Sequence, residues 1–367
     1  MTDQVPNPSK RVMPLYQQVE QYLRKQIASG ALRRGDMLPQ VKDLCEQFGG
    51  ISHLTVRQAI KNLSEENLVK TIHGRGSFVS EELNRDERIA ILLPHLENTL
   101  HVSIAQGAQE IFTAHGLRSL ILDSQGSEAT EGDHIANLKD LPLGGALIFP
   151  IPTGNVAEHI FALKQDGFNF VLVDRYFEDI LTPCVVVDNF LGGYESARHL
   201  SLSRRRVAWI GESHSTPARQ RLEGFRTALN DAGIACPSVL IKHIEVSPDA
   251  PKPYHLAQRE AVWAAVDGLM SLQPPIDGLV CSDDFNALSA LERLENLDVK
   301  VPEQIAVIGF DDIPGAATSS PALTTIRQPM KQLGREAATM LLERLKDKTL
   351  PIRKHVLPIE LIVRESA

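Results

Sequence analysis

Long apolar runs are missing from this sequence. No stretch of 18 uncharged apolar residues occurs, so no segment has the length and composition that a membrane-spanning helix needs. The first sixteen residues lack the apolar core of a secretory signal peptide. We therefore expect a soluble, cytoplasmic protein with no membrane partner. The apolar share of 43% and the charged share of 23% are ordinary for a globular chain.

Clustered cysteines and enzyme signatures are missing as well. The four cysteines, Cys45, Cys184, Cys236 and Cys281, lie far apart, which indicates reduced and mostly buried thiols. There is no GxSxG, HExxH, P-loop or strand-linked GxGxxG sequence, and Gly74-Arg75-Gly76 falls in a predicted hairpin. We expect no catalytic residues, no metal site and no cofactor.

The charge is divided unevenly along the 367 residues, which are too many for one ordinary core. The net charge is −8. Residues 1–80 hold 11 Lys and Arg against 7 Asp and Glu, a net charge of +4, and the remainder has a net charge of −12. Only the first segment is therefore suited to a polyanion such as DNA.

The N-terminal part has the element order of a winged helix, with residues 1–79 as one predicted domain. A loose polar arm over 1–9 precedes a compact unit over 14–79. The predicted elements are helices from Leu15 to just before Gly30, over 41–48 and over 53–65 (capped by Ser52), then strands over 68–72 and 77–79. Residues 80–87 are polar and charged and form the predicted linker.

From Arg88 to Ala367 apolar runs alternate with amphipathic helices. The runs cover 89–93, 119–123, 145–150, 170–173, 185–187, 206–210, 239–243, 278–281 and 305–308. Apolar runs between helices predict parallel sheets covered on both faces, an α/β fold. Nine runs exceed one small sheet, so we expect two doubly wound lobes, roughly 88–187 and 190–311, with crossovers and a C-terminal segment returning to both.

The third predicted helix carries polar donors opposite its apolar stripe. The DNA-binding candidates on this face are His53, Thr55, Arg57, Gln58 and Lys61. Arg pairs bidentately with guanine and Gln with adenine in the major groove, whereas Lys61 is better placed for a phosphate. The hairpin tip, His73-Gly74-Arg75, suits the minor groove. A plain solvated helix face and a plain turn residue at His73 stay open as alternatives.

These motifs resemble the DNA-binding domain of the GntR family of bacterial regulators. The matching segments are PLYQQVEQYLRKQIASGALRRGDMLP, LTVRQAIKNLSEENLV and GRGSFV. The resemblance implies DNA contacts from Thr55, Arg57 and the wing around 73–75, and backbone contacts near Arg33 and Arg34. The chain departs from the family at three places. Gln40-Val41 stand where Ser-Glu is usual and would cap the second helix, and the turn over 48–52, which includes Gly50, has one extra residue. His53 stands where Arg is common.

Residues 88–367 resemble the LacI-type effector domain, which is similar to periplasmic sugar-binding proteins. The resemblance rests on RIAILLP, VVVDNFLGGYESARHL, ARQRLEGFRTALNDAGI, DGLVCSDDFNALSAL, VPEQIAVIGFDDIP and PALTTIRQPMKQLGREAATMLLERL, in this order. A GntR-like head on such a body resembles regulators of the arabinose-repressor type. The expected function is a sequence-specific DNA-binding regulator, a repressor, controlled by a small ligand bound between two lobes.

Polar pairs follow three predicted strands: Asp174-Arg175, Asp283-Asp284 and Asp311-Asp312. Ligands of open α/β sheets bind outside the carboxyl ends of the strands, and carboxylates with guanidinium groups suit a hydroxyl-rich sugar. The resemblance implies ligand contacts at Asp174, Arg221, Asp283, Asp311 and Gln328, and Leu100, His101 and Phe285 are expected in the cleft wall.

Other readings of these residues stay open. Asp284 and Asp312 could be helix caps, and Arg221 could only tie a helix to its lobe. Three aromatic residues are read as packing residues, with an apolar platform for a sugar as the alternative: Tyr254, Trp209 and Trp263. Three departures from the family bear on the ligand. Asp283 stands where Asn is usual, and residues 97–101 stand where the family often has Asn-Pro and two aromatic residues. Residues 243–258 read as a surface insertion.

The expected partners are double-stranded operator DNA with two-fold symmetry, a second copy of the chain in a homodimer, and a small effector, expected to be a sugar. A purine, nucleoside or other non-sugar effector or corepressor is the alternative within this class. A sugar-active enzyme is the alternative from another class, because clustered carboxylates can also do acid–base chemistry.

Overall fold

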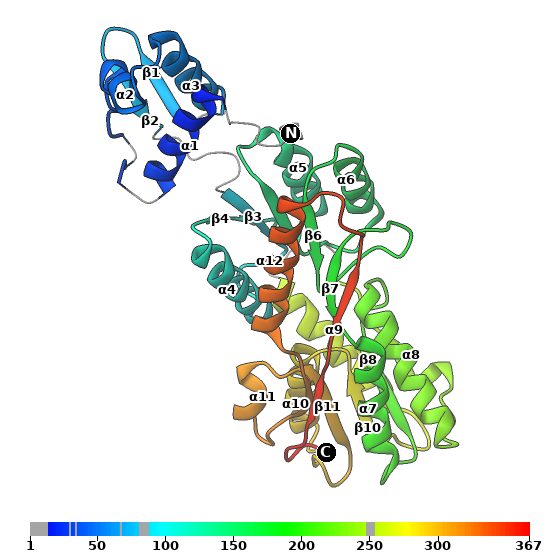
Figure 1. Cartoon of the computed structure of the whole chain (residues 1–367). Helices are drawn as coiled ribbons and strands as arrows, with labels where there is room; N and C mark the ends of the chain where they lie inside the picture. The colour runs from blue at the N-terminus through cyan, green and yellow to red at the C-terminus, as the bar shows by residue number, and fades with distance from the viewer. Residues whose placement is uncertain (1–13, 29–30, 34, 67, 81–87, 247–253) are drawn as a thin grey trace, which may run out of the picture. The chain divides into compact units, whose positions relative to one another are not determined.

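The computed structural model describes residues 14–28, 31–33, 35–66, 68–80, 88–246 and 254–367. Its contacts divide the chain into two compact units, Met1–Glu87 and Arg88–Ala367 (Figure 1). The predicted arm, Gly30, Arg34 and most of the predicted linker lie outside the described residues. Within the described part, no helix has the length and apolar character needed to cross a membrane.

The first unit is the predicted winged helix. Its elements are α1 (Leu15–Ala28), α2 (Val41–Gln47), α3 (His53–Glu65), β1 (Val69–Ile72) and β2 (Gly76–Val79). The two strands pair antiparallel, with Val69 opposite Val79 and Ile72 opposite Gly76. The apolar stripe of α3 is buried as the helical spacing predicts, at Val56, Ala59, Ile60 and Leu63.

The turn between α2 and α3 accommodates the departures from the family pattern. Gln40 precedes α2 and makes no side-chain cap, as the sequence predicts. Gly49 and Gly50 both have positive φ, 79° and 80°, a conformation that is open to glycine at little cost. Ser52 then caps α3, because its Oγ accepts the backbone N–H of Thr55 at 3.1 Å. The extra residue is thus taken up by the glycine pair, and α3 still begins with a regular cap.

The second unit begins with a six-stranded parallel sheet in the order β13-β7-β6-β5-β3-β4. These strands are β3 (Arg88–Leu93), β4 (Arg118–Asp123), β5 (Gly145–Ile148), β6 (Phe170–Val173), β7 (Cys184–Val187) and β13 (Lys354–Leu357). On one face, α4 (Thr99–Ala114) and α12 (Met330–Lys346) share a core with the sheet. On the other, α5 (Glu128–Asn137) and α6 (Gly154–Gln165) do so. We call this the first lobe.

The second lobe has its own six-stranded sheet, in the order β14-β12-β11-β10-β8-β9. Its strands are β8 (Val207–Gly211), β9 (Ile241–His243), β10 (Gly278–Cys281), β11 (Ala306–Asp311), β12 (Thr324–Arg327) and an antiparallel β14 (Glu360–Ile362). Helices α7 (Asn189–Ser201) and α8 (Thr216–Asp231) share one core with it, and α9 (Tyr254–Met270) and α10 (Asp284–Asn296) share the other. The short α11 (Pro314–Thr318) follows β11.

The predicted α/β fold is confirmed, and the C-terminal part adds strands that the apolar runs do not show. All nine runs contain strands, β3 to β11, although the run over 239–243 begins with a 3-10 turn. The chain crosses between the lobes after β7, after β12 and between β13 and β14. Three crossings make a hinge of backbone segments, which allows the lobes to approach or separate as bodies.

Candidate functional site

In the first unit, α3 carries the predicted DNA-binding side chains on its exposed face. His53, Arg57, Gln58 and Lys61 are exposed, whereas Thr55 is half-buried with its hydroxyl 2.9 Å from Ser52 Oγ. The amide of Gln58 donates to Asn62 Oδ1 at 2.7 Å, and Lys61 Nζ lies 3.5 Å from a Glu65 carboxylate oxygen.

The tip of the wing is a tight turn that presents polar groups on a thin backbone. The backbone N–H of Arg75 donates to the Ile72 carbonyl at 3.0 Å, and Gly74 has a φ of 74°. His73, Gly74 and Arg75 are all exposed. Because β1 packs against α3, the unit brings the helix and the hairpin together. The roles of these residues in DNA binding stay predictions.

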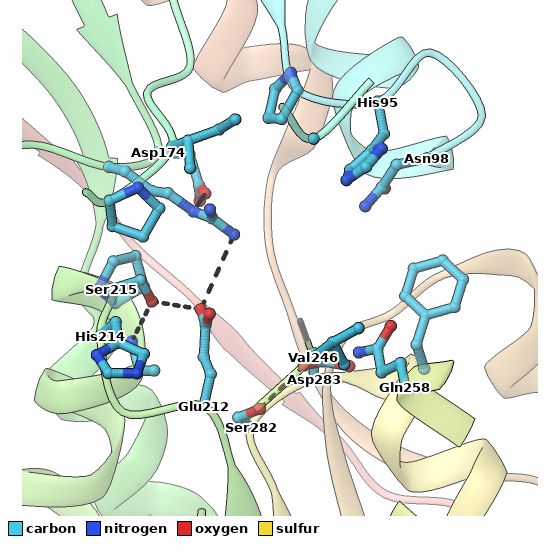
Figure 2. A pocket seen from close by; sticks show the side chains of 18 of the residues that line it. His95, Asn98, Asp174, Glu212, His214, Ser215, Val246, Gln258, Ser282 and Asp283 are labelled. Atoms are coloured by element: carbon cyan, nitrogen blue, oxygen red, sulfur yellow. Dashed lines mark hydrogen bonds and ion pairs between the residues drawn. The ribbon is translucent and has the colours of Figure 1, made fainter. Parts of the chain in front are cut away.

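In the second unit, a cavity of about 890 Å³ lies at the carboxyl ends of strands from both sheets. We call it the cleft. Figure 2 shows Asp174, Glu212 and Ser215 on one side of it and Asn98 and Gln258 on the other. All eight side chains predicted for effector binding line the cleft: Leu100, His101, Asp174, Arg221, Asp283, Phe285, Asp311 and Gln328. Their contacts with a ligand stay predictions.

Further polar residues line the cleft that the sequence did not single out as ligand contacts. They include His95, Asn98, Glu212, His214, Ser215, Tyr254, Gln258 and Asn286. Arg175, the second member of the predicted Asp174-Arg175 pair, lines the cleft as well. Glu212 directly follows β8, and Asn98 caps α4 by accepting the backbone N–H of Leu100 at 2.9 Å. The rule that polar residues after strand ends form a site could have found Glu212. No comparable sequence signal marks Gln258 or Tyr254, which α9 supplies.

Arg221 of α8 is the central cation of the second-lobe wall. Its guanidinium lies 3.5 Å from the centroid of the Phe310 ring. Nε donates to Asn189 Oδ1 at 2.8 Å, and Nη1 donates to the Ser282 carbonyl at 2.6 Å and lies 3.8 Å from Asp311 Oδ1. Arg221 therefore does tie α8 to its lobe, as the alternative reading has it, and it also lines the cleft.

Two aspartates at the ends of first-lobe and second-lobe strands have left-handed backbone conformations. Asp174, after β6, has a φ of 66°, and Asp311, at the end of β11, has a φ of 116°. Such conformations are costly for residues other than glycine and gather at functional sites. Burial raises the pKa of both carboxyl groups, well above the ordinary range for Asp311.

Gln328 follows β12 and lines the cleft next to Asp311. Its Nε2 donates to Asp311 Oδ1, whereas its Oε1 is buried with no hydrogen-bond partner among the described residues. An unpaired acceptor in a buried position is costly unless something donates to it. A hydroxyl group of a ligand in the cleft is a suitable donor.

In the aspartate pair after β10, Asp283 and not Asp284 is the helix cap. Asp283 caps α10, because its Oδ1 accepts the backbone N–H of Asn286 at 2.9 Å. Asp284 instead accepts from Thr325 Oγ1 at 2.6 Å and from the backbone N–H of Ile313 at 2.9 Å, and burial raises its pKa to about 7. The cap reading for Asp284 is therefore wrong, since the preceding residue holds that position.

Asp312 is not a helix cap either. It pairs with Arg327 at 2.7 Å and with Arg364 at 2.6 Å, which joins β11 to β12 and to the C-terminal segment. Trp209 is buried in the core of the second lobe, as expected for a packing residue, and Trp263 packs against the guanidinium groups of Arg259 and Arg293.

Three rings line the cleft near its first-lobe wall. His101 donates from Nδ1 to the His95 carbonyl at 3.1 Å, and burial lowers the pKa of His101 to about 3, so its imidazole is neutral. The tautomer with Nδ1–H leaves Nε2 as an acceptor. The ring of His95 lies 5.1 Å from that of Tyr254, which reaches it from the other lobe. Burial also lowers the pKa of His95.

The two units match different protein families. Residues 15–79 match the family of bacterial regulatory proteins called gntR, and residues 197–367 match the periplasmic binding protein-like domain. The chain is 26% identical to the arabinose metabolism transcriptional repressor of Geobacillus stearothermophilus, over 97% of this chain and 98% of that protein.

Solved structures share the fold. A transcriptional regulator CelR–cellobiose complex has a TM-score of 0.68 and 23% identity, and the match covers 87% of this chain and 92% of that one. A LacI family regulator from Enterococcus faecium with bound ribose has a TM-score of 0.63 and 24% identity, covering 76% and 98%.

Proposed function

We propose a mechanism of control for this chain. The chain is a transcription regulator and not an enzyme, and it joins a GntR-type DNA-binding domain to a periplasmic binding protein-like effector domain. It binds operator DNA as a repressor, and a sugar bound in the cleft changes its affinity for the operator. The observation that carries the proposal is the cleft itself, with polar side chains from both lobes converging on one cavity.

The DNA contacts come from α3 and the wing. Arg57 makes no ion pair among the described residues, so its guanidinium is available for a base edge, and His53 and Gln58 flank it on the exposed face. Thr55 and Lys61 are assigned to phosphates, and the groups at the tip of the wing, His73, Gly74 and Arg75, to the minor groove. Unbalanced positive charge in this segment supports binding to a polyanion.

Ligand control follows from the hinge between the lobes. Groups that would contact one ligand come from both sheets, so a bound ligand favours the closed arrangement. A ligand shifts such an equilibrium only by its differential affinity for the two states. Similar proteins carry arabinose, cellobiose or ribose in their names or titles, which favours a sugar as the ligand.

A homodimer on a two-fold related operator is part of the proposal. The edge strand β4 exposes the apolar side chains Leu120 and Ile121, by 39% and 40%. An exposed apolar edge strand is a ready surface for a second copy, because it offers unpaired backbone groups next to apolar area. Two copies would present two α3 helices to two half-sites.

The test is thermal unfolding of the full chain against a panel of sugars and nucleosides. A ligand at 100 times its Kd adds about 2.7 kcal/mol to the free energy of unfolding. The variant Gln328→Ala, which removes a cleft acceptor, should lose the shift, and Gln332→Ala, on α12 outside the lining, should keep it. A shift that survives Gln328→Ala unchanged would contradict binding in the cleft.

A nucleoside is the second candidate, and the ring pair of His95 and Tyr254 favours it. The two rings pack against each other, with centroids 5.1 Å apart at an interplanar angle of 33°, and aromatic faces of this kind in the cleft can stack on a flat base. In the same panel, a nucleoside that shifts unfolding while no sugar does would decide for this candidate.

A further inference from the structure

Acidic side chains outnumber basic ones in the cleft. Among the described residues, its lining contains five carboxyl groups: Asp174, Glu212, Glu245, Asp283 and Asp311. The same lining contains two guanidinium groups, Arg175 and Arg221, and no lysine. The excess is not spread over an open surface, because Asp174 and Asp311 are buried and converge on the same cavity as Glu212 and Asp283.

Both guanidinium groups already lie beside carboxyl groups of the cleft. Arg221 already donates to Asn189 and to the Ser282 carbonyl, lies 3.8 Å from Asp311 and covers the Phe310 ring. Arg175 lies between two carboxylates, with Nε 3.6 Å from Asp174 Oδ2 and Nη2 3.9 Å from Glu212 Oε1. A phosphate or carboxylate that drew either guanidinium group away would leave buried carboxyl groups without their cations.

The histidines do not supply the missing positive charge. Burial lowers the pKa of His101 to about 3, and it also lowers the pKa of His95. His214 lies at the outer part of the lining, where its Nε2 is 3.3 Å from Glu245 Oε1. The acidic excess at the centre of the cleft therefore stays uncompensated by imidazolium groups.

The groups that remain for a ligand include several acceptors. Ionised carboxylates accept hydrogen bonds and do not donate them. Burial raises the pKa of Asp174, Asp283 and Asp311, which favours the uncharged form of these three carboxyl groups. Gln328 Oε1 is a buried acceptor with no partner among the described residues, and His101 Nε2 is the acceptor nitrogen of a neutral ring. Acceptors require a ligand that brings donors, which hydroxyl groups do and phosphate oxygens do not.

We infer that the effector of this cleft is an uncharged, hydroxyl-rich molecule and that its anionic derivatives are excluded. The inference rests on the proposed role of the cleft in effector binding and narrows the class of effector. Phosphorylated sugars, uronic acids and nucleotides fall outside that class, and free sugars and nucleosides fall inside it. Glu212 and Asp283 are the residues that enforce the selection, because their carboxyl groups line the cavity and the guanidinium group beside Glu212, that of Arg175, is shared with Asp174.

The experiment compares matched neutral and anionic compounds by isothermal titration calorimetry on the full chain. The pairs are arabinose and arabinose 5-phosphate, glucose and glucose 6-phosphate, galactose and galacturonate, and adenosine and AMP. We expect the anionic member of the binding pair to have a Kd at least tenfold higher than its neutral partner. An anionic member that binds as tightly as its neutral partner, or more tightly, would overturn the inference.

Charge-removing variants test the cause of the selection. The double variant Glu212→Gln/Asp283→Asn should lower the Kd ratio of anionic to neutral member at least threefold. The matched control Glu195→Gln removes a carboxylate from α7, where Glu195 pairs with Arg198 outside the cleft lining, and should leave the ratio unchanged. A ratio that stays the same in the double variant would contradict the electrostatic cause.

The outcomes separate this inference from the proposed function. If adenosine binds and AMP and all sugars do not, the exclusion of anions holds and the assignment of a sugar fails. If a sugar phosphate binds more tightly than its parent sugar, the chain is a sugar sensor and the exclusion fails.

Discussion

Glu131 shows how the cleft wall is held at the scale of single residues. It is fully buried on α5, its Oε1 accepts the backbone N–H of Ile151 at 2.7 Å, and its Oε2 accepts the Ser124 hydroxyl at 3.0 Å. Ile151 lines the cleft, and Ser124 begins the loop after β4 that also reaches it through Gly126. Burial raises the pKa of Glu131 to about 7. A buried carboxyl group thus joins two loops of the effector site.

The raised pKa makes the stability of the effector domain depend on pH. Because the folded state binds this proton more tightly than the unfolded state, the stabilisation by protonated Glu131 is full below about pH 4.5 and is lost as pH rises through about 7. We expect Glu131→Gln to raise the free energy of unfolding at pH 8 by at most about 3 kcal/mol, and to change it little at pH 4.5. Gln can keep both contacts by accepting from Ile151 and donating to Ser124.

Chemical denaturation at the two pH values measures this difference. Glu158→Gln, at an exposed position of α6, is the control and should leave the pH dependence as it is. A Glu131→Gln variant that is equally destabilised at both pH values would contradict the raised pKa of Glu131 as the source of the pH dependence.

Arg57 is the residue on which operator recognition should depend most. A bidentate contact between arginine and a guanine edge contributes about 1–3 kcal/mol, so Arg57→Ala should weaken binding to a selected operator by roughly 5- to 150-fold. Lys25→Ala, at an exposed position in the last turn of α1, is the control for loss of one positive charge. Fluorescence anisotropy with labelled duplex measures both. Equal losses in the two variants would show that Arg57 contributes only charge.

The residues of the cleft were predictable where they follow a strand, because the carboxyl ends of parallel strands meet at one edge of a sheet. Asp174, Asp283 and Asp311 were found in this way, and the resemblance supplied Arg221 and Gln328. Which of the two aspartates, Asp283 or Asp284, caps α10 was not predictable, since the roles of adjacent carboxyl groups depend on the backbone conformation at each residue. Tyr254 lines the cleft because of where α9 packs, which is a tertiary effect.

At the scale of elements, glycines set how closely two helices of the first lobe approach. A Cβ atom on Gly107 of α4 would lie 2.0 Å from the Lys331 carbonyl oxygen, and one on Gly334 of α12 would lie 1.9 Å from the Ile104 carbonyl oxygen. Each glycine thus lets its helix touch the backbone of the other. Because α12 directly follows the crossing after β12, this contact anchors the hinge segment to the first lobe.

Adding a methyl group at this contact should force the helices apart. We expect Gly334→Ala to lower the free energy of unfolding by about 1–3 kcal/mol, since backbone atoms cannot move aside as side-chain tips do. Gly268→Ala on α9 is the matched control, because its nearest neighbours are Lys242 atoms at 3.8 Å. That variant should be neutral or stabilise by up to about 1 kcal/mol. Thermal unfolding measures both, and equal effects would contradict the close contact as the cause.

The sequence predicted the central strands of both sheets and missed three that complete them. β3, β5 to β8, β10 and β11 are near-continuous apolar runs, which buried parallel strands require. The sequences of β12, β13 and β14 are TTIR, KHVL and ELI, short and partly polar. Their strand conformation depends on pairing with a strand from another part of the chain, which no local pattern reveals.

At the scale of the whole molecule, the two parts of the chain carry opposite charge. Residues 1–80 have a net charge of +4 and the remainder one of −12. The acidic part repels a phosphate backbone, so productive binding is confined to the winged helix. The uneven charge distribution thus favours DNA binding through the N-terminal part of the chain.

The exposed edge strand should carry the homodimer. We expect Leu120→Asp to shift the chain from dimer to monomer at micromolar concentration, because it places a charge in an apolar interface. Phe161→Asp, at a side chain 51% exposed on α6 of the same lobe, is the control and should leave the dimer intact. Sedimentation velocity distinguishes the species. A dimer that persists in Leu120→Asp would place the interface elsewhere.

The central claim is that the cleft and the DNA-binding surface are coupled, and reciprocal titration tests it most directly. The Kd of the ligand identified by thermal unfolding is measured by calorimetry on the full chain, once free and once saturated with operator duplex. Coupling of about 1–3 kcal/mol predicts that DNA changes the ligand Kd by roughly 5- to 150-fold, and that the ligand changes the DNA Kd by the same factor. For a repressor released by its ligand, both changes are losses of affinity. Identical ligand Kd values with and without operator would contradict the account.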